Sequence, residues 1–185
     1  MGAGPAEVVD GYPWGGASVM FVLPVNHPDT APLRVGLLSD THGLLRPEAK
    51  AFLRGSDRII HAGDICDPAI LDELLAIAPV TAVRGNCDQG PWAGRLRWTE
   101  SLRVGGVLIY VLHDLAQLDL DPGERGVGVV VSGHSHKPKV EDRDGVLLVN
   151  PGSCGPRRFR LPVAVGELII AGGRVSARTV ELAVK

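Results

Sequence analysis

The sequence predicts an α/β fold in which a pair of mixed sheets is flanked by helices. From residue 33 onward, short apolar runs each end in a polar cluster, as parallel strands do when they carry functional loops at their carboxyl ends. Two segments with helical periodicity, 47–54 and 68–77, separate the first three runs. The later runs are instead separated by Asp-Gly and Gly-Gly turns, which indicate antiparallel hairpins.

The elements follow in that order along the chain. The front half is predicted to alternate strands 34–38, 58–60 and 80–83 with the two helices, and Asp67 is positioned to cap the second helix. Each helix also has a proline near its first turn, where a missing amide hydrogen is tolerated. Strands over 107–112 and 127–131 come next, and the tail is predicted to form hairpins from strands 139–141, 146–149, 163–171 and 174–182.

Length and composition indicate one catalytic domain, which we place at residues 33–185. The chain has 185 residues and is 45% hydrophobic, enough for one compact core. We interpret residues 1–32 as a loosely ordered extension or an incorrectly assigned start, with Met20 as the alternative first residue. The apolar run 17–25 is short and lacks a basic flank, so we expect neither a signal peptide nor a membrane span.

Charge and cysteine content narrow the functional classes. The 19 Lys and Arg residues nearly balance the 21 Asp and Glu residues, so there is no strong signal for nucleic-acid binding. The cysteines, Cys66, Cys87 and Cys154, are odd in number and have no regular spacing, which argues against a secreted, disulfide-stapled protein and favours the cytoplasm.

The polar clusters after the strands contain residues of the types that bind metal ions. Any single Asp or His after a strand is more often a turn former or cap, but five clusters that each contain such a residue are hard to assign to turns alone. On extended backbone, residues i and i+2 point the same way, so Asp40 with His42, and His134 with His136, can each present two ligands together. The candidate metal ligands are Asp40, His42, Asp64, Asn86, His113, His134 and His136.

The ordered motifs resemble those of the calcineurin-like metallophosphoesterases. They are Asp40-Thr41-His42, Gly63-Asp64, Gly85-Asn86, the isolated His113 and Gly133-His134-Ser135-His136. The following Asn150-Pro151-Gly152-Ser153 resembles the small bacterial and archaeal branch of YfcE-like phosphodiesterases. The resemblance covers residues 33–185.

This resemblance implies a four-layer α/β/β/α sandwich and a hydrolase that cleaves a small phosphate ester, most often a diester. It implies two divalent ions, manganese before iron, zinc or nickel, and attack by a hydroxide that bridges them. It assigns three residues to each ion and one to both: Asp40, His42 and His136 to the first, Asn86, His113 and His134 to the second, and Asp64 to the bridge.

One position departs from the family pattern. Most catalytic members have histidine, thought to protonate the leaving oxygen or bind the phosphate, where this chain has Cys87. A thiol with an ordinary pKa of about 8.5 is a poor replacement for an imidazolium. We therefore expect slow hydrolysis of esters with poor leaving groups, and we take Cys87 and Asp88 as the candidate catalytic residues.

Other residues receive weaker interpretations. His27 and His61 are given no role, and His61 is expected to pack or hydrogen-bond near the site. The stretch 157–160 could contact a substrate phosphate or simply be a solvated loop. Trp92 and Trp98 could form a wall for a nucleobase or aryl group, although packing is the more common role of tryptophan.

Two alternatives to a small phosphodiesterase remain at this stage. One is a non-catalytic scaffold of the same fold that binds protein partners, as the retromer scaffold subunit does. A scaffold need not keep a complete charged cluster, which is costly to bury. The other is a nuclease, which the near-neutral charge disfavours. An oligomer is possible, but the sequence does not indicate its order.

Overall fold

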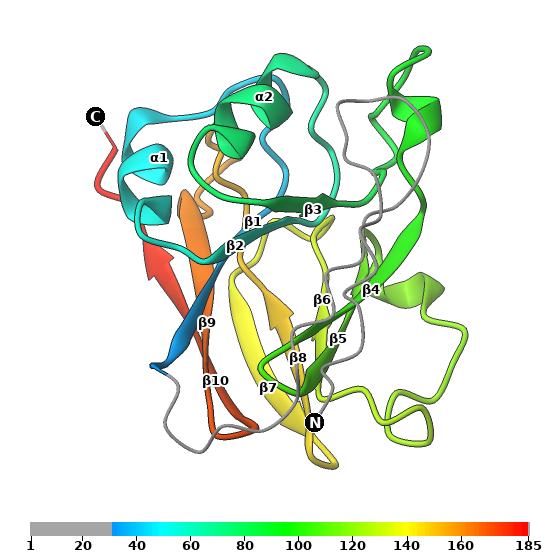
Figure 1. Ribbon diagram of the computed structural model, residues 1–185. Helices are drawn as coiled ribbons and strands as arrows, with labels where there is room; N and C mark the ends of the chain where they lie inside the picture. The colour runs from blue at the N-terminus through cyan, green and yellow to red at the C-terminus, as the bar shows by residue number, and fades with distance from the viewer. Residues whose placement is uncertain (1–30, 185) are drawn as a thin grey trace, which may run out of the picture.

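The computed structural model describes residues 31–184, which fold around two mixed five-stranded sheets (Figure 1). The first sheet has the order β10-β9-β1-β2-β3 and consists of β1 (Leu33–Leu38), β2 (Arg58–His61), β3 (Val80–Ala82), β9 (Ala164–Ala171) and β10 (Arg174–Glu181). The second has the order β4-β5-β6-β8-β7 and consists of β4 (Thr99–Val104), β5 (Val107–Leu112), β6 (Val129–Val131), β7 (Lys139–Arg143) and β8 (Val146–Asn150).

Alternation along the strands places the main core between the two sheets. Val35 and Leu37 of β1 are fully buried and pack in one cluster with Ile109 of β5 and Val129 of β6. Leu38, which points to the other face, belongs to the cluster beneath the helices instead. This division follows from the period-two geometry of a strand that is covered on both faces.

The helices α1 (Pro47–Leu53) and α2 (Ala69–Leu75) cover the outer face of the first sheet and lie together in Figure 1. In α1, Ala49 and Leu53 are buried one turn apart, so they form the face that packs on the sheet. The N-cap of α2 is Pro68 and not Asp67 as predicted, but the side chain of Asp67 accepts a hydrogen bond from the Ala69 amide at 3.0 Å and so supports the start of the helix from one residue earlier.

The outer face of the second sheet has a thinner cover. Tyr110, Leu112 and Leu148 pack there against Leu115 and Leu118, from a segment that contains the 3-10 helix η2 (Leu115–Gln117). The predicted α/β sandwich of the metallophosphoesterase type is therefore confirmed, and its fourth layer is this segment in place of an α-helix.

The predicted hairpins are confirmed. Strands β7 and β8 pair antiparallel around Asp144 and Gly145, and β9 and β10 pair antiparallel around Gly172 and Gly173. All four turn residues have positive φ, as both residues of a type I′ hairpin turn do. The sequence analysis did not predict β4, an edge strand whose side chains alternate between exposed and partly buried, nor the preceding 3-10 helix η1 (Ala93–Arg95).

Most of the predicted extension, residues 1–32, and His27 lie outside the described residues. Among residues 31–184, no helix is long and apolar enough to cross a membrane.

Candidate metal centre

The polar clusters meet at one edge of the sandwich. Strands β1, β2 and β3 run parallel in the first sheet, and β5 and β6 run parallel in the second, so their carboxyl ends deliver five loops to the same rim. Backbone hydrogen bonds join these loops: the His42 amide donates to the Asp64 carbonyl at 2.9 Å, and the Gly133 amide donates to the His113 carbonyl at 2.8 Å. The structure thus brings together all seven candidate ligands.

Asp40, His42 and His136 form the first half of the cluster. His136 Nε2 lies 3.1 Å from Asp40 Oδ1 and 3.4 Å from His42 Nε2, which is 3.9 Å from the same carboxylate oxygen. Two ligands on one ion stand about 3.0 Å apart in octahedral geometry and about 3.4 Å apart in tetrahedral geometry, for metal–ligand bonds of about 2.1 Å. The spacing of these three atoms therefore suits one divalent ion.

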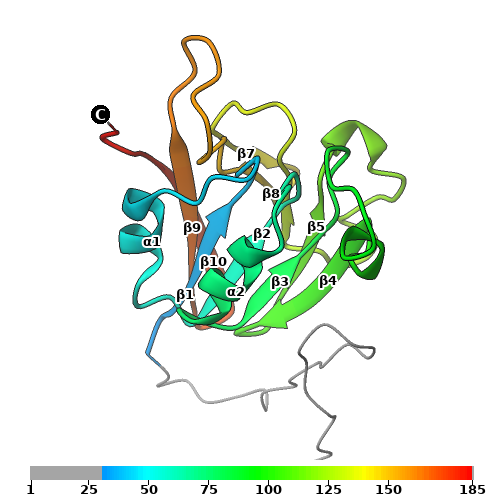
Figure 2. The same cartoon turned by 90° about the horizontal axis from the view of Figure 1, so that it is seen from above.

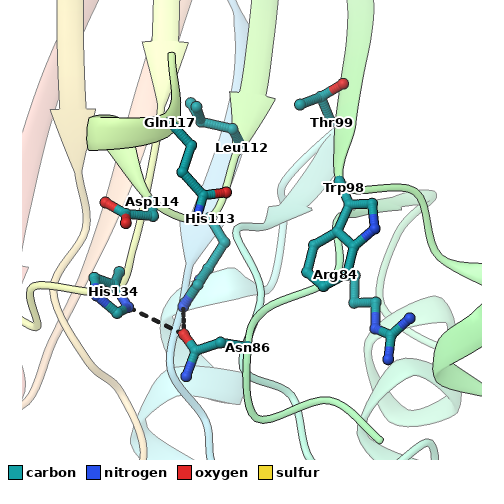
Figure 3. A pocket seen from close by; sticks show the side chains of 9 residues that line it. All are labelled: Arg84, Asn86, Trp98, Thr99, Leu112, His113, Asp114, Gln117 and His134. Carbon is teal, nitrogen blue, oxygen red and sulfur yellow. Dashed lines mark hydrogen bonds between the residues drawn. The ribbon is translucent and has the colours of Figure 1, made fainter. Parts of the chain in front are cut away.

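Asn86, His113 and His134 form the second half. Asn86 Oδ1 lies 3.1 Å from His113 Nε2 and 3.1 Å from His134 Nδ1. Figure 3 shows both imidazole rings directed at this amide oxygen. Both distances are close to the spacing of about 3.0 Å expected for two ligands of one octahedral ion.

Asp64 stands between the two halves. Its Oδ2 lies 3.8 Å from His42 Nε2 and 3.4 Å from His113 Nε2, so one carboxylate oxygen faces a histidine of each set. Its Oδ1 accepts a hydrogen bond from the Cys87 amide at 2.8 Å. Burial alone would raise the pKa of Asp64, but the hydrogen bonds from His113 and Cys87 outweigh it and hold the pKa well below its usual range. The group is therefore a carboxylate at neutral pH.

The nitrogen and oxygen atoms of the cluster are mostly acceptors. His113 Nδ1 lies 2.7 Å from the Ala62 carbonyl, which can only accept, so Nδ1 carries a proton. In the neutral ring the lone pair is then on Nε2, which faces Asp64 and Asn86. Asp40 is fully buried, and its Oδ1 has no hydrogen-bond donor. Lone pairs that converge in this way leave a place for cations, so the residues present fit divalent metal ions.

The pKa values of His42 and His113 shift in opposite directions. Burial lowers the pKa of His42 despite the nearby carboxylates Asp64 and Asp40, which leaves its ring neutral and able to act as a ligand. Burial also disfavours the charged form of His113, but hydrogen bonds with Asp64 and Ala62 outweigh this effect and raise its pKa. The charged ring carries its second proton on Nε2, which faces Asp64, so a proton and a metal ion would compete for this nitrogen.

The backbone differs from the predicted extended form at the ligand pairs. Asp40 and His42 have φ values of 54° and 44°, and His134 and His136 have values of 64° and 58°, all in the left-handed region. The i and i+2 side chains of each pair do lie in the same cluster, but the reason given from the sequence is wrong. Left-handed non-glycine residues are strained, and they persist where the surrounding structure fixes them, as at functional sites.

Asp88 joins two of the loops beneath the cluster. The side chain is buried, and its Oδ1 accepts hydrogen bonds from the amides of Ile65 and Cys66 at 2.8 and 2.7 Å. Its Oδ2 accepts from the amides of Asp64 and Gly85 at 3.1 and 2.7 Å. Four backbone bonds occupy the lone pairs that a proton-transfer group would use, so this geometry favours positioning of the Asp64 loop; a catalytic role for Asp88 stays a prediction.

Gly85 and Asn150 also shape the rim. A Cβ on Gly85 would lie 2.2 Å from both the amide nitrogen and Oδ1 of Asp64, so only glycine permits this approach. Asn150 Nδ2 donates to the Gly133 carbonyl at 2.6 Å and to Ser135 Oγ at 3.1 Å, which holds the loop that carries His134 and His136. The sequence analysis noted the motif around Asn150 for its resemblance to the YfcE-like branch, but these contacts depend on tertiary structure.

Cys87 is exposed and faces the cluster. Its Sγ lies within 4.8 Å of ligand atoms of His42 and Asp64. Burial and the neighbouring Asp64 carboxylate raise the pKa of the Cys87 thiol, so it is neutral near pH 7. Burial likewise raises the pKa of Cys66 to about 12. The side chain at position 87 is therefore placed beside the reaction space, and its role as a catalytic residue stays a prediction.

The histidine, the tryptophans and the basic loop that received weaker interpretations differ in their exposure and contacts. His61 is fully buried, donates to or accepts from Thr41 Oγ1 at 3.0 Å, and has its pKa lowered to about 3 by burial, so it packs beside the site as predicted. Trp92 packs against the core under the helices, whereas Trp98 is 56% exposed. The loop between β8 and β9 projects from the rim in Figure 2, and its Phe159 is 96% exposed.

Comparisons with known proteins identify the family. The model of the calcineurin-like phosphoesterase superfamily domain matches residues 33–170. The chain is 38% identical over 158 residues to a probable metallophosphoesterase of Methanothermobacter thermautotrophicus, an alignment that spans 79% of this chain and 91% of the relative. The chain belongs to the calcineurin-like phosphoesterase superfamily.

Further known proteins are similar to the chain in sequence or in structure. A phosphodiesterase of Methanocaldococcus jannaschii is 27% identical over 66% of this chain and 84% of its own. Among solved structures, an archaeal phosphodiesterase has a TM-score of 0.68 at 23% identity, covering 81% of this chain and 100% of its own. Vacuolar protein sorting 29 of Cryptosporidium parvum has a TM-score of 0.66 at 19% identity, covering 82% of this chain and 98% of its own. At these identities the structural likenesses bear on the fold alone.

Proposed function

We propose that the protein is a dinuclear metal-dependent phosphodiesterase that hydrolyses small phosphate diesters. The observation that carries the proposal is the placement of Asp64 Oδ2, 3.8 Å from His42 Nε2 in one ligand set and 3.4 Å from His113 Nε2 in the other. One carboxylate shared by two sets of acceptors fits two divalent ions, and manganese suits nitrogen and oxygen ligands without thiolate. Membership of the family supports the hydrolase activity.

The two ions, when bound, would activate a water molecule and neutralise charge on the phosphoryl group. The side chains of the chain would hold and orient them: Asp40, His42 and His136 on one, Asn86, His113 and His134 on the other, and Asp64 on both. The Ala62 carbonyl fixes the tautomer of His113, and Asp88 fixes the loop that carries Asp64. Cys87 lies where a proton donor for the leaving oxygen would stand, but its neutral thiol is a weak acid for that task.

Hydrolysis of bis(p-nitrophenyl) phosphate tests the proposal. We expect turnover with manganese, its loss on addition of EDTA and its recovery when excess manganese is restored. Asp40→Asn should lower kcat at least ~100-fold, whereas Asp121→Asn, at an exposed turn, should leave it unchanged. Turnover that survives removal of metal, or an Asp40→Asn variant as active as the wild type, would refute the proposal.

The same experiment addresses the scaffold and nuclease alternatives. A scaffold of this fold would show no metal-dependent turnover on any ester, and a nuclease would prefer a polynucleotide to the small diester. The cytoplasmic location expected from the cysteines stays a prediction.

A further inference from the structure

A pocket opens beside the second half of the metal centre. It has a volume of about 130 Å³ and is lined in part by Asn86, His113 and His134, the three residues of that half. Figure 3 shows these residues on one side of the pocket and Trp98 with Arg84 on the other. An organic group bonded to a phosphorus atom at the centre would therefore lie next to the pocket.

The wall opposite the ligands is planar and fixed. The Arg84 guanidinium carbon lies 4.7 Å from the centroid of the Trp98 ring. Arg84 Nε and Nη2 both donate to the Asp88 carbonyl, at 3.2 and 3.1 Å, so the guanidinium is held in place before any ligand arrives. Trp98 remains 56% exposed although it is one of the largest apolar side chains in the described residues. Indole and guanidinium planes both bind aromatic rings by stacking.

The size and chemistry of the pocket suit one aromatic ring. An engineered cavity of about 150 Å³ in another protein binds benzene, which is close to the volume available here. Leu112 adds apolar surface, and Thr99 and Gln117 offer hydrogen bonds to polar ring substituents. A flat aromatic ring would extend the Arg84–Trp98 stack with apolar contact, which a short alkyl group cannot do.

We infer that this pocket binds an aromatic ring in the organic group of the phosphate ester, so that the substrates are aryl or nucleoside esters. The inference rests on the proposed function, because the phosphate must be held at the adjacent metal centre. Trp98 is the residue that determines this specificity. Its role is binding, and it takes no part in bond making or breaking.

Two phosphonates that resist hydrolysis isolate the contribution of the ring. In benzylphosphonate a CH₂ group stands for the ester oxygen of phenyl phosphate, and ethylphosphonate lacks the ring. Calorimetric titration of the manganese-loaded protein should show that benzylphosphonate binds at least about 5-fold more tightly, the lower end of what stacking contributes per ring. Trp98→Ala should reduce this ratio to less than about 2 without changing the affinity for ethylphosphonate.

Two control variants complete the test. Trp98→Phe keeps an aromatic ring and should retain most of the preference, and Val140→Ala, an exposed position on β7 at the opposite edge of the sheet, should retain all of it. Equal binding of the two phosphonates by the wild type, or an unchanged ratio in Trp98→Ala, would overturn the inference alone. Failure of both phosphonates to bind the metal-loaded protein would also overturn the inference, whereas the proposed function, which concerns diesters, is tested separately by the turnover of bis(p-nitrophenyl) phosphate.

Discussion

Replacement of Asp88 by asparagine is expected to destabilise the fold as well as the metal centre. Each carboxylate oxygen of Asp88 accepts hydrogen bonds from two backbone N–H groups. In an asparagine the side-chain oxygen would still accept from one pair of these N–H groups, but the side-chain NH₂ would face the other pair and could not accept from it. A buried N–H group without an acceptor costs ~1–3 kcal/mol, so two of them should cost ~2–6 kcal/mol. A domain of this size loses about 2–4 °C in Tm per kcal/mol, which gives a decrease of roughly 4–24 °C.

Thermal unfolding followed by circular dichroism in EDTA measures this effect without a contribution from bound metal. Asp121→Asn is the matched control, because Asp121 Oδ1 also accepts two backbone amides, from Gly123 at 2.8 Å and Glu124 at 3.2 Å, but at an exposed turn. That variant should lose no more than ~1 kcal/mol, since water can replace the lost bonds. Equal decreases in Tm for the two variants would refute the view that Asp88 organises the rim.

Three further predictions concern other positions. Burial would raise the pKa of Glu167, but its hydrogen bonds with Arg34 and Arg178 outweigh burial and lower the pKa from 4.5. The stabilisation of the fold by the Glu167 carboxylate is therefore present above pH 4.5 and is lost as the pH falls through the lowered pKa. Urea unfolding of Glu167→Gln should consequently be less sensitive to acid than that of the wild type. Asn150→Ala should weaken manganese binding ~10- to 100-fold in calorimetry, because the Gly133 loop loses its support, and unchanged affinity would contradict this role. Cys87→His should raise kcat/KM more for alkyl esters than for nitrophenyl esters, by up to ~10²-fold, because only alkyl leaving groups need a proton. If, at matched metal content, kcat/KM changed equally for the two ester classes, position 87 would be excluded from protonation of the leaving group.

Local sequence patterns predicted most strands and the candidate metal ligands, because these ligands follow directly after apolar strands. The apolar runs before Asp40, Asp64 and His113 identified strands β1, β2 and β5. Strands β1 and β2 run parallel in one sheet and β5 runs parallel to β6 in the other, and the two packed sheets bring the following residues to one rim. Strand β4 was missed because its side chains alternate between exposed and partly buried at a sheet edge, without a strong apolar run. Such a strand is specified by its hairpin partner β5 more than by its own residues.

Contacts between loops could not be predicted from the sequence. The left-handed backbone at Asp40 and His42 and the four bonds to Asp88 arise only when the loops after different strands meet. The pocket wall has the same origin, since Arg84 and Trp98 lie on separate segments that stack in the folded chain. Tryptophan alone indicates burial more often than a binding site, so the partly exposed ring of Trp98 became informative only in the structure.

The metal content of the purified chain tests the central claim most directly. After reconstitution with manganese and removal of the excess, elemental analysis should find about two ions per wild-type chain. His42→Ala should retain about one, because it contributes to a single ligand set, whereas Asp64→Asn should lose occupancy at both sites because its Oδ2 faces both. A wild-type protein with at most trace metal, or an Asp64→Asn variant that keeps two ions, would contradict a dinuclear centre bridged by Asp64.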